Sequence, residues 1–173
     1  MSSIKIYLTN LGKYNEGELV GEWLELPASD LEIAETLERI GINENYEEYF
    51  ITDYETEVSD LKIGEYDSVE DLNELAEVIN DNEPEKVSAL IYYGYDTAEE
   101  IQSHIDDVNY VCTPIGAESE EFAVGWYYAK ELGGLDIPEN IEPYFDFEAY
   151  GRDIMLEGQF YTAEDGSIYE LIG

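Results

Sequence analysis

The sequence predicts an α+β protein that forms an elongated chain of three small domains. These are an N-terminal α+β domain (residues 1–62), a helical middle domain (63–107) and a C-terminal α+β domain (108–173). Apolar and polar residues alternate as in strands at both ends of the chain, and between them apolar residues recur at helical spacing after helix-capping residues. These patterns predict this order of domains. The elongation follows from charge: 43 acids against 7 bases give a formal net charge of −36, and like charges repel one another in a compact body.

The N-terminal domain is expected to begin with a strand over Ile4–Asn10, paired in a hairpin with Leu19–Leu26. The residues between them, Leu11–Glu18, contain two glycines and are expected to form a turn-rich loop. A short helix over Leu31–Ile40 follows, and the β-branched and aromatic run Tyr49–Glu55 predicts a third strand. The apolar residues at helical spacing in this helix are Leu31, Ala34 and Leu37.

The middle domain is predicted to contain three helices. The first spans residues 68–80, begins at the cap residue Ser68 and has its apolar side chains at helical spacing. Pro84 suits the first turn of the second helix, and a capping box at Thr97–Glu100 opens the third. The buried stripe of the first helix consists of Val69, Leu72, Leu75, Ala76 and Ile79.

The C-terminal domain begins with the apolar run Val108–Cys112. A helix capped by Ser119 is expected next, and a second helix is expected over Asp146–Leu156. Two short strands, Gln159–Tyr161 and Ser167–Ile172, flank an Asp-Gly pair and predict a hairpin.

Acidic residues are distributed evenly. They outnumber bases by 15 to 3 in residues 1–60, and by 14 to 2 in both 61–110 and 111–173. On the first middle helix the acids occur three or four positions apart, where like charges cost about 0.2–0.5 kcal/mol per pair. One explanation is a solvated acidic face; the other is a surface selected for its charge. The acids of this row are Glu70, Glu74, Glu77 and Asp81.

The composition excludes several classes of partner. A basic patch is the mark of direct nucleic-acid binding, and an anionic membrane surface also attracts bases, so we expect neither partner. Aromatic residues make up 13% of the chain, which argues against a disordered acidic tail. The single cysteine, the lack of an apolar leader and the lack of an 18-residue apolar run predict a cytoplasmic protein.

Catalytic and metal-binding motifs are weak. Gly12-Lys13-Tyr14 is not a P-loop, because Tyr7 stands where the first glycine would be and Tyr14 replaces the Ser or Thr that would bind Mg²⁺; no EF-hand loop occurs either. His104 and Cys112 could be imagined as a catalytic pair, but a satisfied helix histidine and a buried thiol explain them better. Weak Ca²⁺ or Mg²⁺ binding by acidic clusters stays open. We expect no enzyme activity, no cofactor and no metal site.

Three blocks of sequence resemble the ArdA antirestriction proteins of plasmids and conjugative transposons. They are LGKYNEGELVGEWLELP (Leu11–Pro27), EEYFITDYE (Glu47–Glu55) and FDFEAYGRD (Phe145–Asp153), and Tyr127–Glu139 looks like the region called the antirestriction motif. The resemblance implies an elongated dimer of small domains that mimics DNA. It implies that carboxylates imitate duplex phosphates and that the protein occupies the DNA groove of Type I restriction-modification enzymes.

On this reading the protein carries phosphate-mimicking acids and a dimer interface, with a restriction-modification enzyme and a second copy as its partners. The C-terminal segment is expected to dimerise, by resemblance and because an apolar run needs cover; its residues are Val108, Tyr110, Val111 and Cys112. The predicted phosphate mimics are Glu70, Glu74, Glu77, Asp81, Glu99, Glu100, Asp106, Asp107, Glu118, Glu120 and Glu121.

Alternatives remain at this stage. The charge could adapt the protein to high salt, or the mimic could be directed at another DNA-binding protein. The tyrosines also have two interpretations: they pack in and beneath the surface with their hydroxyls reaching solvent, or some of them form hot spots against the enzyme. Those singled out include Tyr46, Tyr49, Tyr54, Tyr66, Tyr92, Tyr93, Tyr95, Tyr110, Tyr127 and Tyr128.

Overall fold

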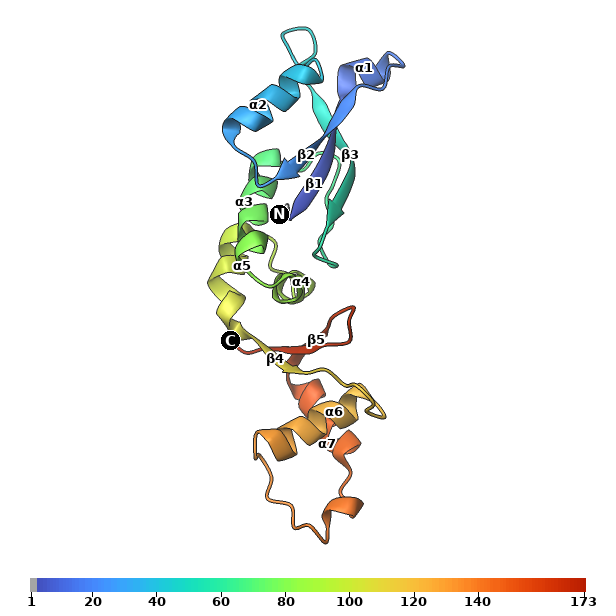
Figure 1. The fold of residues 1–173 in the computed structure, drawn as a ribbon, viewed down its shortest axis with the longest axis vertical. Helices are drawn as coiled ribbons and strands as arrows, with labels where there is room; N and C mark the ends of the chain where they lie inside the picture. The colour runs from blue at the N-terminus through green and yellow to red at the C-terminus, as the bar shows by residue number, and fades with distance from the viewer. Residues whose placement is uncertain (1–2) are drawn as a thin grey trace.

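Two three-stranded antiparallel sheets lie at different levels of a long molecule, with helices between and beyond them (Figure 1). A computed structural model describes residues 3–173. The molecule exposes 10369 Å² of surface, whereas a compact monomer of this mass exposes about 8,600 Å². The α+β class predicted from the sequence is therefore confirmed, and the excess of surface agrees with an elongated body.

The first sheet has the order β2-β1-β3. Strand β1 (Ile4–Asn10) pairs with β2 (Gly21–Leu26) on one side and with β3 (Tyr49–Thr56) on the other. All three strands agree with the sequence prediction within a few residues. The alternation of β1 buries Ile4, Ile6 and Leu8 completely, because successive side chains of a strand point to opposite faces.

The segment expected to be a loop after β1 contains a short helix instead, α1 (Leu11–Asn15). Asn10 explains the difference. Its side-chain oxygen accepts a hydrogen bond from the Lys13 amide at 3.0 Å, and its side-chain amide donates to the Ile40 carbonyl at 3.0 Å. A buried N-cap thus starts a helical turn that the glycines alone did not predict.

Helix α2 (Asp30–Arg39) forms as predicted. Leu31 is 67% exposed and Ala34 is exposed as well. The inward side carries Ile33, Thr36 and Leu37, spaced as one helical face. Of the three apolar residues that the sequence places at helical spacing, only Leu37 lies on this inward side. Ser29 and Glu32 form a full capping box at the start of the helix.

The middle of the molecule is helical, as the sequence predicts. Helix α3 (Val69–Asp81) is followed by α4 (Pro84–Tyr92), α5 (Ala98–His104) and a 3₁₀ turn, η1 (Ile105–Asp107). Helix α4 lies between the two sheets (Figure 1) and is buried over Val87–Leu90. The whole predicted stripe of α3 is buried.

The second sheet has the order β4-β6-β5. Strands β5 (Gln159–Thr162) and β6 (Ile168–Leu171) form the predicted hairpin, and β4 (Val108–Cys112) pairs with β6. Strand β4 therefore lies at an edge of the sheet.

Beyond this sheet, helices α6 (Glu120–Trp126) and α7 (Phe147–Glu157) cross closely, together with a π-helical turn η2 (Tyr127–Glu131) and a 3₁₀ turn η3 (Glu142–Tyr144). Glycines make this approach possible. A Cβ atom on Gly151 would lie 1.7 Å from the Glu121 carbonyl oxygen, and one on Gly125 would lie 1.9 Å from the Phe147 carbonyl oxygen. The two helices thus pack backbone against backbone.

The buried apolar side chains do not divide into three cores. One cluster runs from the first sheet through α3, α4 and α5 to Tyr161, Tyr169 and Leu171 of the second sheet. A smaller cluster, centred on Val111, Val124 and Ile168, lies between the second sheet and α6. The division of the chain at residues 62 and 107 therefore stays a prediction.

Candidate functional site

The acids predicted as phosphate mimics lie almost entirely at the surface. Nine of the eleven are exposed, and Asp107 and Glu121 are half-buried. They fall into three groups along the molecule. The first lies on α3, the second on α5 and the η1 turn, and the third on the approach to α6 and its first turn. The second sheet separates the third group from the others (Figure 1), so the acids form a series rather than one cluster.

The α3 row is the most regular of these groups. Glu70, Glu74, Glu77 and Asp81 are all exposed on the side opposite the buried stripe. At a rise of 1.5 Å per residue they extend over about 16 Å of helix axis. The helix dipole favours Glu70 in the first turn of α3 and disfavours Asp81 in the last turn. The last turn carries no basic side chain that would offset the charge there.

Four of the seven basic residues pair with acids other than the predicted mimics. Arg39 contacts Glu22 at 2.9 Å, and Lys130 contacts Glu142 at 2.9 Å. Lys5 lies 3.8 Å from two carboxylates of the first sheet, and Arg152 pairs with Glu148. Among residues 3–173, the only predicted mimic in an ion pair is Asp107, whose carboxylate lies 2.9 Å from His104. The other ten predicted acids take part in no ion pair among these residues, and Glu120 accepts a hydrogen bond from the Thr162 hydroxyl at 3.2 Å.

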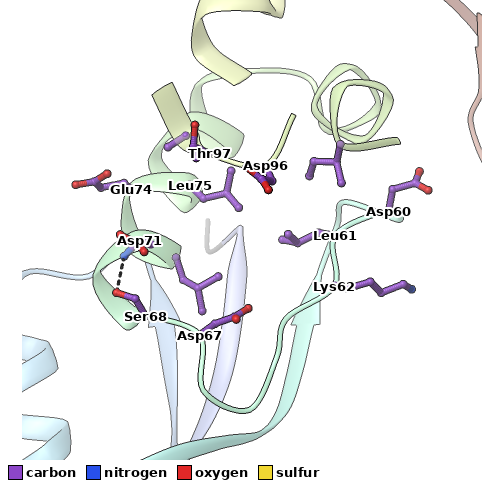
Figure 2. Close-up of a pocket in the computed structure, with 13 residues that line it drawn as sticks. Asp60, Leu61, Lys62, Asp67, Ser68, Asp71, Glu74, Leu75, Asp96 and Thr97 are labelled. Atoms are coloured by element: carbon purple, nitrogen blue, oxygen red, sulfur yellow. Dashed lines mark hydrogen bonds between the residues drawn. The ribbon is translucent and has the colours of Figure 1, made fainter. Parts of the chain in front are cut away.

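A cavity of about 620 Å³ adds acids that the sequence analysis missed. It lies between the segment after β3, helix α3 and the start of α5, and Figure 2 shows Asp67, Asp71 and Asp96 around it. The Asp71 amide donates to the Ser68 hydroxyl at 3.2 Å. Lys62 also lines the cavity, and the end of its side chain extends away from the three aspartates (Figure 2). Only the fold brings these three segments together, so local spacing gave no signal of this group.

The predicted dimer segment is mostly covered by its own chain. Val108 and Val111 are buried against β6 and the small cluster under α6. Tyr110 is 51% exposed, and Cys112 is half-buried. Burial and the nearby Glu120 raise the pKa of the Cys112 thiol, which makes it a poor nucleophile. His104, the other member of the imagined catalytic pair, contacts the Asp107 carboxylate at 2.9 Å rather than Cys112.

An apolar groove of about 510 Å³ lies between the end of β4, the loop that follows it, and helix α6 with the η2 turn. Ile115 and Trp126 are exposed within it, and Glu131 is its one charged side chain. This surface contrasts with the acidic helices of the middle segment.

No group of three or more His, Cys, Asp or Glu side chains in the described part of the chain is arranged to hold a metal ion. No helix of residues 3–173 is long and apolar enough to cross a membrane.

Comparison with known families settles the identity at the family level. The model of the family described as "Antirestriction protein (ArdA)" matches residues 6–169, nearly the whole chain. The protein belongs to the ArdA family. The resemblance drawn from three sequence blocks is thereby confirmed, and membership implies an antirestriction function and an interaction with restriction enzymes. ArdA proteins form a family of inhibitors. A search of curated proteins returned no match.

Proposed function

We propose that this ArdA protein mimics duplex DNA and occupies the DNA-binding groove of a Type I restriction-modification enzyme in the cytoplasm. The observation that carries the proposal is the series of predicted carboxylates on α3, α5 and α6 along a long body, none of which forms an ion pair with a base among residues 3–173. A groove that binds phosphates presents Lys and Arg, and free carboxylates offer these side chains charge-assisted hydrogen bonds. The protein then acts by binding and needs no catalytic residue.

The charge of the chain matches a duplex in scale. Duplex DNA carries one charge per about 1.7 Å of helix axis, so 36 charges correspond to about 60 Å of duplex. A compact chain of 173 residues has a radius of gyration of about 16 Å, too small for that spacing. The extra exposed surface supports a body long enough to display its charges at intervals closer to those of DNA.

We also propose that two copies associate through the C-terminal segment. Strand β4 is an edge strand, and edge strands offer unpaired backbone groups to a neighbour. Tyr110, Ile115 and Trp126 provide exposed apolar area beside it. Two chains with this net charge repel one another over most of their surface, so a groove with one carboxylate is the favourable place for contact. A dimer would imitate about 120 Å of duplex.

Competition for the enzyme's DNA site tests the proposed function. A labelled duplex bound to a Type I restriction-modification enzyme is titrated with the unlabelled protein, and fluorescence anisotropy reports the bound DNA. We expect complete displacement, with an apparent affinity that falls in proportion to the DNA concentration. Inhibition of cleavage while the duplex stays bound would exclude groove occupancy and indicate a different inhibitory site.

A further inference from the structure

Tyr66 is displayed at the tip of a fixed turn between β3 and α3. Its side chain is 72% exposed. The turn is closed on both sides: the Asp67 amide donates to the Gly64 carbonyl at 3.2 Å, and the Gly64 amide donates to the Asp67 carboxylate at 2.8 Å. The Ile51 amide of β3 also donates to the Glu65 carbonyl at 2.8 Å. The ring is therefore presented to solvent by a backbone that is already ordered.

An aromatic stack supports this ring from beneath. Phe50 is nearly buried, and its ring stacks with Tyr66 at a centroid distance of 6.2 Å and an interplanar angle of 23°. Tyr14 also packs edge-on against Phe50, at a centroid distance of 5.4 Å. The stack fixes the orientation of Tyr66 while most of its ring stays accessible, so little side-chain entropy is left to lose on binding.

Carboxylates surround a hollow of about 300 Å³ beside the ring. Glu65 and Glu70 are exposed at this hollow and belong to no ion pair among residues 3–173. Glu70 is also the first acid of the α3 row, so the hollow continues that row towards the first sheet. The carboxylate of Asp67 lines the hollow too, but it already accepts the Gly64 amide.

We propose that this hollow is a binding site for an arginine side chain of the enzyme that the protein inhibits. A guanidinium group is planar and weakly hydrated, stacks on aromatic faces and binds carboxylates through two parallel hydrogen bonds. Tyr66 supplies the face, and Glu65 and Glu70 supply the carboxylates. A lysine ammonium is a compact, strongly hydrated charge and gains less from the ring. The net charge of −36 favours a basic occupant over an apolar or acidic one.

The same domain already holds a cation in this way. Lys13 Nζ lies 5.5 Å from the centroid of the Tyr46 ring, and the Tyr46 hydroxyl donates to a Glu16 carboxylate oxygen at 2.9 Å. The Tyr46 ring thus contacts one base of this chain, and a carboxylate binds the hydroxyl of the same ring. At Tyr66 the same combination of groups is present, and no base of the described chain is paired with its carboxylates.

The identity of the partner rests on the proposed function, but the site itself can be tested without the enzyme. Hexa-arginine and hexa-lysine peptides carry the same number of charges and differ in the group that meets the ring. Their affinities for the full-length protein are measured by calorimetry at one ionic strength. The variants are Tyr66→Ala, which removes the ring, and Tyr66→Phe, which retains it. Tyr144→Ala is the matched control, because Tyr144 is 87% exposed and contributes nothing to this hollow.

We expect Tyr66→Ala to lower the affinity for hexa-arginine by about two- to five-fold, the range of an exposed cation–π contact, and to leave hexa-lysine binding nearly unchanged. Tyr66→Phe and Tyr144→Ala should bind both peptides as the natural protein does. Equal losses for the two peptides, or equal losses in Tyr66→Ala and Tyr144→Ala, would overturn the site. If the peptide results agree and DNA is still not displaced from the enzyme, the proposed function fails while the arginine site stands.

Discussion

The hydroxyl of Tyr161 donates a hydrogen bond to an Asp60 carboxylate oxygen at 2.6 Å and joins residues separated by 101 positions in the chain. Ser88 of α4 completes the contact, because its hydroxyl donates to the same oxygen at 2.6 Å and lies 2.8 Å from Tyr161. Tyr161 belongs to the second sheet, and Asp60 follows the first. This three-residue network therefore connects both sheets through the central helix, and it fixes the distance between acids at the two ends of the body.

Removal of the Tyr161 hydroxyl should destabilise the whole molecule. Tyr161 is nearly buried, and a hydrogen bond to a charged group contributes about 1.5–3 kcal/mol. We expect Tyr161→Phe to lower the free energy of unfolding by about that amount in urea titrations. Tyr144→Phe, at an exposed tyrosine, should leave the unfolding midpoint unchanged. Identical midpoints for the two variants would show that the network contributes no stability.

Alkaline pH should weaken the fold through its buried tyrosines. Burial, with Glu85 and Glu83 nearby, raises the pKa of Tyr169 to about 12, and burial with the bond to Asp60 raises the pKa of Tyr161. Because the neutral ring is favoured only in the folded state, this stabilisation is complete below the ordinary pKa of about 10 and is lost as the pH rises towards 12.

Urea unfolding at several pH values between 8 and about 12 measures this loss. The Tyr161→Phe variant should lose less stability over the same interval, because it has one such hydroxyl fewer. A free energy of unfolding that stays constant or rises above pH about 10 would contradict the assigned direction of the pKa shifts.

Neutralisation of the α3 row should weaken inhibition without weakening the fold. We expect the variant Glu70→Gln, Glu74→Gln, Glu77→Gln, Asp81→Asn to inhibit the enzyme clearly less, while Glu74→Gln alone changes inhibition little. The stability of the quadruple variant should be equal to or higher than that of the natural protein, since like charges three and four residues apart repel by about 0.2–0.5 kcal/mol per pair.

A control with the same change in net charge separates the row from bulk charge. Glu22, Glu25, Glu55 and Glu142 each contact a base of this chain, so their replacement by Gln should reduce inhibition less than the loss of the row. Equal loss in the two quadruple variants would show that net charge alone determines inhibition, without a role for the free carboxylates of α3.

Dimerisation should depend on the exposed side of the C-terminal segment. Val111 is only 3% exposed, so an aspartate there would disrupt the small core rather than report on an interface. Tyr110→Asp and Ile115→Asp change accessible side chains and should yield folded monomers in sedimentation velocity experiments. An unchanged dimer in both variants would remove the β4 surface from the interface.

Regular periodicity allowed much of the fold to be predicted. The β1 alternation and the α3 stripe each depend on one element that packs with one face inward, so the sequence pattern and the structure agree. Helix α1 was missed because it depends on the buried side chain of Asn10. The exposed Leu31 shows that an apolar residue at helical spacing can still lie at the surface.

For the candidate site as well, features within a single element could be predicted from the sequence, and features that join distant segments could not. The α3 row could be read from residue spacing within a single helix. The acids around the cavity, the stack of Tyr66 on Phe50 and the contact of Tyr161 with Asp60 join segments far apart in the sequence. A one-dimensional pattern contains no information about such pairings, so these features required the fold.

The salt dependence of enzyme binding tests the central claim of DNA mimicry most directly. DNA binding loses affinity with a slope near −0.9 per phosphate contact as counterions return to the duplex. The same enzyme is titrated with the duplex and with the protein at several salt concentrations between about 50 and 200 mM. We expect the protein's affinity to fall with salt but with a shallower slope, because aromatic contacts such as that of Tyr66 are not screened. Binding that does not change with salt would contradict mimicry by carboxylates, and a slope as steep as that of DNA would exclude an aromatic contribution.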